Sequence, residues 1–161
     1  MLDNAIHRDV YRPFQHWRDA FPAHVELIRA PREEPPPPLD DATHLRITGS
    51  EATILDGDPW VEPQLDRIRE AAERRMPVLG SCHGHQMIAL ALGGPDCIRR
   101  AAEPELGWIQ LEVDRDDALF AGAATPVWVF SSHFDEVARL PEGFVAPART
   151  ARCALHALRH R

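Results

Sequence analysis

The sequence lacks three features that mark particular classes of protein. It contains no lysine: all 18 basic residues are arginine, and 25 acidic residues bring the formal net charge to −7. An acidic balance without a basic cluster argues against nucleic-acid binding. No apolar run is long enough to span a membrane, and no basic segment precedes an apolar leader. We therefore expect a cytoplasmic protein without a membrane partner.

Cysteine is also scarce, and its spacing is uninformative for metals. The three cysteines, Cys82, Cys97 and Cys153, include no Cys-x-x-Cys pair, which argues for a reducing compartment and against a structural zinc site. Among nine histidines, His83 and His85 are the close pair nearest to Cys82, and the sequence around them offers no set of acidic and thiol ligands for a metal. The sequence predicts no metal site and no cofactor.

One cysteine lies between two glycines in the segment Gly80-Ser-Cys82-His-Gly84. Residues 76–80 before it are typical of a short buried strand, and residues 84–92 after it of a helix that ends at a glycine pair. Gly-x-Cys-x-Gly at such a junction is the thiol form of the nucleophile elbow. The dipole of the following helix favours a thiolate. The pattern predicts Cys82 as a nucleophile, with an inert buried cysteine as the alternative.

Apolar runs alternate with helical patterns along the chain, which favours βαβ units and a parallel sheet. We predict a single domain over residues 1–161, an α/β three-layer sandwich with a mostly parallel central sheet. Residues 31–41, with four consecutive prolines, are expected to form an extended connection. The expected helices cover residues 11–21, 62–75 and 84–92, and the expected strands residues 24–30, 45–48, 76–80, 108–113 and 126–130.

Four motifs in order resemble the class I glutamine amidotransferases, most closely their GMP-synthase-like glutaminase domains. The family's flavodoxin-like fold agrees with the α/β prediction. The motifs are Ile47-Thr-Gly-Ser-Glu51, Pro77-Val-Leu-Gly-Ser-Cys-His-Gly-His-Gln86 with its following Leu-Gly-Gly, Glu105-Leu-Gly-Trp108, and Ser131-Ser-His-Phe-Asp-Glu-Val137 with its following Leu-Pro-Glu-Gly.

The resemblance implies hydrolysis of the glutamine side-chain amide to glutamate and ammonia, with the ammonia passed to a synthetase or other acceptor partner. Cys82 would be the nucleophile, and the backbone N–H groups of Gly49 and His83 would form the oxyanion hole. His133 stands near Asp135 as a base stands near its carboxylate, yet in the family this histidine belongs to the substrate-binding segment. The residues implied for the glutamine pocket are Gln86, Ser132, His133 and Phe134.

The sequence departs from the family at both ends. The family's catalytic base and its carboxylate belong to a His-Pro-Glu motif on a later strand, and no His-Pro-Glu occurs in residues 1–161. Residues 1–3 resemble only the tail of the family's first strand. We therefore expect a domain that is incomplete at both ends and impaired in catalysis.

Two other interpretations remain open. A catalytically silent module would keep the pocket and bind glutamine or a partner. A hydrolase or deglycase of the related superfamily would use the histidine directly after the nucleophile, here His83, as its base.

Overall fold

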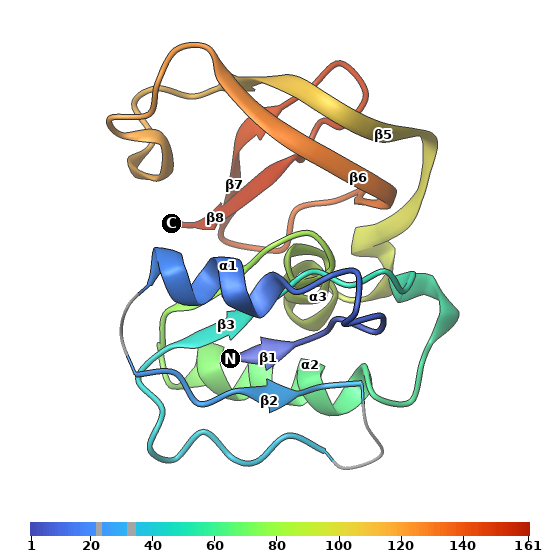
Figure 1. Cartoon of the computed structure of the whole chain (residues 1–161). Helices are drawn as coiled ribbons and strands as arrows, with labels where there is room; N and C mark the ends of the chain where they lie inside the picture. Colours follow the sequence, from blue (N-terminus) through green and yellow to red (C-terminus); the bar gives the residue numbers. More distant parts are fainter. Residues whose placement is uncertain (22–23, 32–34) are drawn as a thin grey trace. The chain divides into compact units, whose positions relative to one another are not determined.

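The computed structural model describes residues 1–21, 24–31 and 35–161, which form two compact units, residues 1–92 and 93–161 (Figure 1). That the whole chain acts as one domain stays a prediction. The extended connection expected over residues 31–41 lies partly outside the described residues, and its described remainder contains no helix or strand.

The first unit contains the predicted parallel sheet. Its four strands run in the order β2-β1-β3-β4, and every neighbouring pair is parallel. Its centre is apolar, since Leu2 and Ile47 are at most 1% exposed. Parallel sheets need this burial because helices cover both faces. The strands are β1 (Leu2–Asp3), β2 (Ile28–Arg29), β3 (Leu45–Ile47) and β4 (Val78–Gly80).

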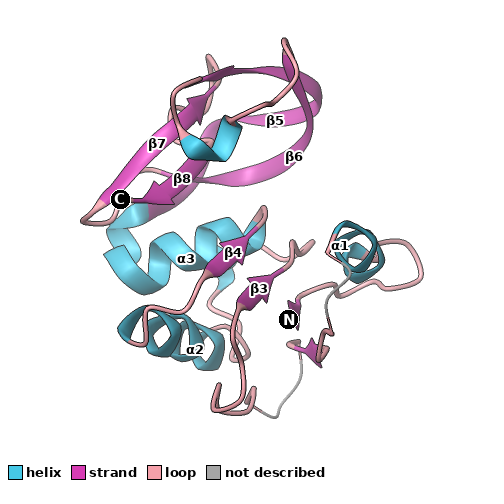
Figure 2. Cartoon of the chain, turned by 90° about the vertical axis from the view of Figure 1, so that its left-hand side faces the viewer, coloured by secondary structure: helices cyan, strands magenta, loops and turns pink. Residues whose placement is uncertain are grey.

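Three α-helices accompany this sheet, and Figure 2 shows α2 and α3 on one side of it and α1 on the other. Helix α2 buries Leu65, Ile68 and Ala71 on one face. None of the helices in the described ranges is long and apolar enough to cross a bilayer. The helices are α1 (Pro13–Ala20), α2 (Glu62–Glu73) and α3 (His83–Gly93), with short 3₁₀ turns at Ile54–Asp56, Pro95–Cys97 and Ala118–Phe120.

The second unit departs from the prediction of a mostly parallel sheet. Its strands are antiparallel, in the order β6-β5-β7-β8. The expected strands at 108–113 and 126–130 are confirmed, but they pair directly, with Trp108 opposite Phe130. A period-two pattern reports a half-buried strand and not the direction of its neighbour. The strands are β5 (Ile98–Val113), β6 (Val127–Val137), β7 (Phe144–Arg149) and β8 (Ala157–His160).

Candidate active site

Cys82 lies at the turn from β4 into α3, where the sequence places a nucleophile elbow. Its thiol is exposed and not in a disulfide, and its φ angle is +52°. A left-handed φ is uncommon for a residue with a side chain and costs about 1–3 kcal/mol, so the surrounding structure must impose it. The strained turn thus presents an exposed thiol between the end of a strand and the start of a helix, as a nucleophile elbow does.

The flanking glycines are needed because three backbone segments meet at this turn. A Cβ atom added at Gly84 would collide with the backbone carbonyl of Ile47 on β3, and one added at Gly80 would collide with the backbone of Gly84. The backbone N–H of Ser81 donates to the Ile47 carbonyl over 3.1 Å. Strand β3 therefore presses directly against the elbow, and only glycine fits at these two positions.

Gly49 lies beside Cys82, as expected for an oxyanion loop. A Cβ atom added at Gly49 would stand 3.3 Å from the Cβ of Cys82. Gly49 comes just after β3 and Cys82 just after β4, so both lie beyond the carboxyl ends of neighbouring parallel strands. The structure thus brings together the two backbone segments that an oxyanion hole requires.

A buried hydrogen-bond network holds the base of the Gly49 loop. The Thr48 hydroxyl accepts the backbone N–H of Asn4 over 2.9 Å and lies 3.4 Å from a carboxylate oxygen of Asp3. Glu51 accepts the backbone N–H groups of Ile6 and His7, at 3.0 and 3.1 Å. The loop is therefore tied to the segment after β1, which limits its freedom to move away from Cys82.

Tyr11 is a site residue that no sequence motif indicated. Its hydroxyl would be 2.6 Å from a Cβ atom added at Gly49, so it lies against the candidate oxyanion loop. The pKa of Tyr11 is raised to about 12, chiefly by burial and then by the negative charges of Cys82, Glu51 and Asp3. Tyr11 precedes α1, and only the folded chain places it beside Gly49.

The high pKa of Tyr11 gives a direct prediction, since this is the single tyrosine in the chain. We expect its phenolate absorbance to appear near pH 12 and not near pH 10. Because the folded pKa lies above the unfolded value, the stabilisation is complete below pH 10 and is lost as pH rises through about 12. A shift of this size corresponds to at most about 2.7 kcal/mol, and solvent screening of this partly exposed ring lowers that figure. An ultraviolet pH titration, with Tyr11→Phe as the blank, checks it; an ordinary midpoint near pH 10 would place the hydroxyl in solvent.

His83 and Gln86 lie on α3 directly after the nucleophile. The ring of His83 is packed against that of Trp60, with centroids 5.5 Å apart, and the residue is 1% exposed. Gln86 is 6% exposed, and its backbone N–H donates to the carbonyl of Cys82 over 3.1 Å. The backbone of His83 is thus at the helix start beside Cys82, while its ring is buried in the packing of the first unit.

Ser132, His133 and Phe134 lie on β6 of the second unit. Ser132 and Phe134 are exposed, whereas the side chain of His133 is 14% exposed and its Nε2 is 3.2 Å from Glu105. The nearby Asp135 pairs with Arg100 at 2.9 Å. The imidazole of His133 thus faces Glu105, while Asp135 forms an ion pair with Arg100. Membership of these β6 residues in a glutamine pocket stays a prediction.

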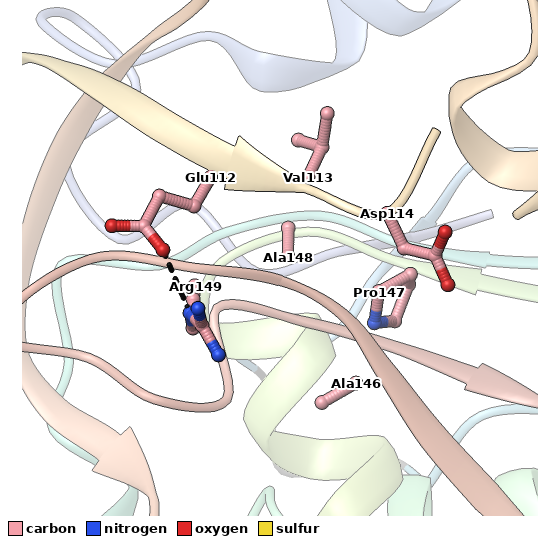
Figure 3. Close-up of a pocket in the computed structure, with 7 residues that line it drawn as sticks. All are labelled: Glu112, Val113, Asp114, Ala146, Pro147, Ala148 and Arg149. Atoms are coloured by element: carbon pink, nitrogen blue, oxygen red, sulfur yellow. Dashed lines mark hydrogen bonds and ion pairs between the residues drawn. The ribbon is translucent and has the colours of Figure 1, made fainter. Parts of the chain in front are cut away.

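The second unit also contains a pocket of about 310 Å³ at the junction of β5 and β7 (Figure 3). An ion pair between Glu112 and Arg149, at 2.8 Å, is its charged feature. The seven described residues that line it contribute neither a thiol nor an imidazole, so it offers none of the chemistry found at Cys82. Its lining is Glu112, Val113, Asp114, Ala146, Pro147, Ala148 and Arg149.

The turn at Cys82 and the adjacent Gly49 both lie within a match to a recognised family. The family model for "Glutamine amidotransferase class-I" matches residues 49–161. The chain is a class I glutamine amidotransferase by family. This confirms the resemblance that the sequence motifs indicated.

Relatives of this class I glutamine amidotransferase include a subunit of glutamine-hydrolysing GMP synthase from several archaea. The chain is 37% identical to that of Methanocaldococcus jannaschii over 108 residues, 67% of this chain and 56% of the relative. It is 40% identical to that of Methanosarcina acetivorans over 110 residues, 66% of this chain and 56% of the relative. The match thus spans little more than half the length of these relatives.

Solved structures show the same fold. A glutamine amido transferase from Methylobacillus flagellatus superposes with a TM-score of 0.84 at 24% identity, covering 99% of this chain and 65% of that one. A GMP synthase subunit from Thermoplasma acidophilum gives 0.74 at 23% identity, covering 100% of this chain and 78% of that one. The parallel and antiparallel sheets are both part of the class I amidotransferase fold.

Proposed function

We propose that this chain binds glutamine and attacks its side-chain carboxamide through Cys82, as a glutaminase domain of the GMP synthase type. The observation that carries the proposal is the exposed thiol of Cys82, held at a left-handed φ beside the Gly49 loop. A strained, exposed nucleophile next to backbone donors fits acyl transfer better than structural packing.

The proposed first step forms a bond between the Cys82 sulfur and the carboxamide carbon. The carbonyl π electrons move to the oxygen, and the resulting oxyanion is stabilised by the backbone N–H groups of Gly49 and His83. The proton that the Cys82 thiol loses passes to the amide nitrogen, directly or through water. Collapse of the intermediate then breaks the carbon–nitrogen bond and releases ammonia, leaving a thioester. Water then hydrolyses the thioester to glutamate. Loss of one such oxyanion donor typically lowers kcat by about 10²- to 10³-fold.

The pocket residues follow from the family resemblance. Gln86 lies one helical turn after Cys82 and is 6% exposed, which suits a side chain that closes one wall of a small site. Ser132, His133 and Phe134 are proposed as pocket residues from the family resemblance alone. This chemistry uses the chain's own groups and no cofactor.

Residues 1–161 contain no His-Pro-Glu, so we propose that their catalysis is impaired. The same absence favours a second candidate, a silent module that binds glutamine or a partner without turnover. The third interpretation uses the His83 ring as base. Its packing against Trp60 at 1% exposure argues against that role, because the ring would have to leave its packing to reach a substrate.

The ammonia acceptor is proposed from the relatives. Each is named as one subunit of GMP synthase, which implies that a further subunit exists. We propose that this chain acts with a synthetase partner in the cytoplasm. A pull-down of that partner, or an increase in ammonia incorporation when it is added, would follow from this assignment.

The test is labelling with a glutamine-like chloroketone, read by peptide mass spectrometry. We expect Cys82 to react first and free glutamine to protect it. Cys97 is fully buried, and burial raises the pKa of Cys153 to about 11, so neither presents an accessible thiolate near neutral pH. Iodoacetamide, which is not a glutamine analogue, serves as the control alkylating reagent. Preferential labelling of Cys97 or Cys153, or no protection by glutamine, would count against the proposal.

A further inference from the structure

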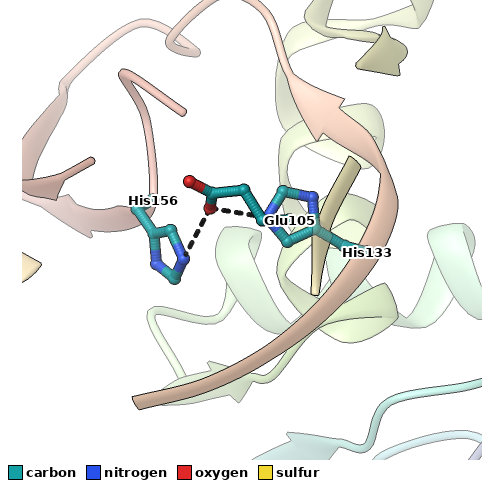
Figure 4. A group of neighbouring side chains, drawn as sticks. All are labelled: Glu105, His133 and His156. Atoms are coloured by element: carbon teal, nitrogen blue, oxygen red, sulfur yellow. Dashed lines mark hydrogen bonds and ion pairs between the residues drawn. The ribbon is translucent and has the colours of Figure 1, made fainter. Parts of the chain in front are cut away.

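The second unit contains a cluster of one carboxylate and two imidazoles (Figure 4). Glu105 on β5 lies opposite His133 on β6 in the sheet register, and His156 comes just before β8. Oε2 of Glu105 is 3.2 Å from Nε2 of His133 and 3.5 Å from Nε2 of His156. The three side chains are 4%, 14% and 17% exposed, so the cluster is largely shielded from solvent.

Thr150 fixes the orientation of the carboxylate. Its hydroxyl oxygen accepts the backbone N–H groups of Arg152 and Cys153, at 3.2 and 2.9 Å, and the hydroxyl proton is donated to Oε1 of Glu105. Oε2 is thereby left facing both imidazole rings. Carboxylates that bind metals are usually oriented by a hydrogen bond of this kind to their other oxygen.

Hydrogen bonding alone does not account for the cluster. Nε2 of His156 is buried and has no hydrogen-bond partner among the described residues, although it is aimed at the Glu105 carboxylate. A buried imidazole nitrogen without a hydrogen-bond partner and a carboxylate oxygen that face one common point provide two ligand atoms for a cation.

The distances fit a small divalent metal. Zinc binds imidazole nitrogen at about 2.0–2.1 Å and carboxylate oxygen at about 2.0–2.2 Å, so tetrahedral ligand atoms stand about 3.3–3.5 Å apart. The separations from Glu105 Oε2, 3.2 and 3.5 Å, bracket this value, and all three ligand atoms lie within 4.8 Å of one another.

We propose that Glu105, His133 and His156 bind one divalent transition-metal ion, with zinc as the best fit to this donor set. Three protein ligands leave a fourth position for water or a substrate group. The ion would join β5, β6 and the segment before β8. The sequence pattern predicts no metal site, because the three ligands come from separate segments and no short motif contains two of them.

Zinc binding to the metal-stripped 161-residue chain tests this site. Calorimetry is expected to give one zinc ion per chain, and Co²⁺ should give the strong visible bands of a tetrahedral site. Glu105→Gln and His156→Ala should each weaken zinc binding by roughly 100-fold or more, and Thr150→Val by about 10- to 100-fold, while Thr150→Ser retains the affinity. His160→Ala, on β8 outside the cluster, is the matched control and should bind as the parent does.

Circular dichroism confirms that each variant is folded before its affinity is compared. Should His156→Ala fail to fold, the comparison of Thr150→Val with Thr150→Ser provides the test instead. Zinc uptake that is unchanged by Glu105→Gln and by Thr150→Val would overturn the site, as would uptake well below one ion per chain. The proposal shares His133 with the proposed glutamine pocket and otherwise goes beyond the proposed function. Its readouts do not involve Cys82 or glutamine, so a failure of the metal site and a failure of the proposed function are distinguishable.

Discussion

Replacement of Gly84 by alanine is expected to destabilise the protein by about 1–3 kcal/mol and to disturb the position of Cys82. The added Cβ would collide with the backbone carbonyl of Ile47, a residue with no exposed surface and no freedom to move aside. Alanine is the better helix former by about 1 kcal/mol, but a clash between the added Cβ atom and a backbone carbonyl costs more than this gain. The net effect is therefore a loss of stability.

Urea unfolding compares the Gly84→Ala variant with the parent. Ser81→Ala is the matched control, since Ser81 is exposed at the same turn and the change adds no atom. We expect the control to lie within about 0.5 kcal/mol of the parent. A Gly84→Ala protein as stable as the control would show that β3 and the elbow are not in close contact.

The first unit follows closely from the sequence because each of its elements is encoded locally. The helices and strands around Cys82 lie within a few residues of their predicted bounds, and the glycines that flank it have the close backbone contacts expected of them. The oxyanion hole that the resemblance implies needs Gly49 near Cys82, and the parallel register of β3 with β4 brings these two residues together.

The antiparallel second sheet was not predicted, since strand direction depends on distant pairing and not on local periodicity. The strand at residues 108–113 extends back to Ile98 through a register shift between Arg100 and Glu105, which no turn signal marks. Tyr11 near Gly49, and His156 near Glu105, were missed for the same reason. Each contact joins segments far apart in the sequence, and only the fold brings them together.

Residues 1–161 are expected to release ammonia from glutamine about 10²- to 10⁴-fold more slowly than a class I glutaminase that has its His-Pro-Glu pair. General-base catalysis supplies a factor of this size, and a catalytic triad acts as a unit, so its loss is not offset by an intact nucleophile. The oxyanion donors beside Cys82 would leave a residual rate.

The central claim is that Cys82 attacks glutamine and that residues 1–161 lack the His-Pro-Glu base. Its most direct test is ammonia release from the 161-residue chain, its Cys82→Ser variant and its His83→Ala variant. We expect a slow release that Cys82→Ser abolishes and that His83→Ala leaves essentially unchanged, because the buried His83 ring takes no part. Ordinary glutaminase turnover by the parent chain would contradict this claim, and loss of that turnover in His83→Ala would assign the base to His83.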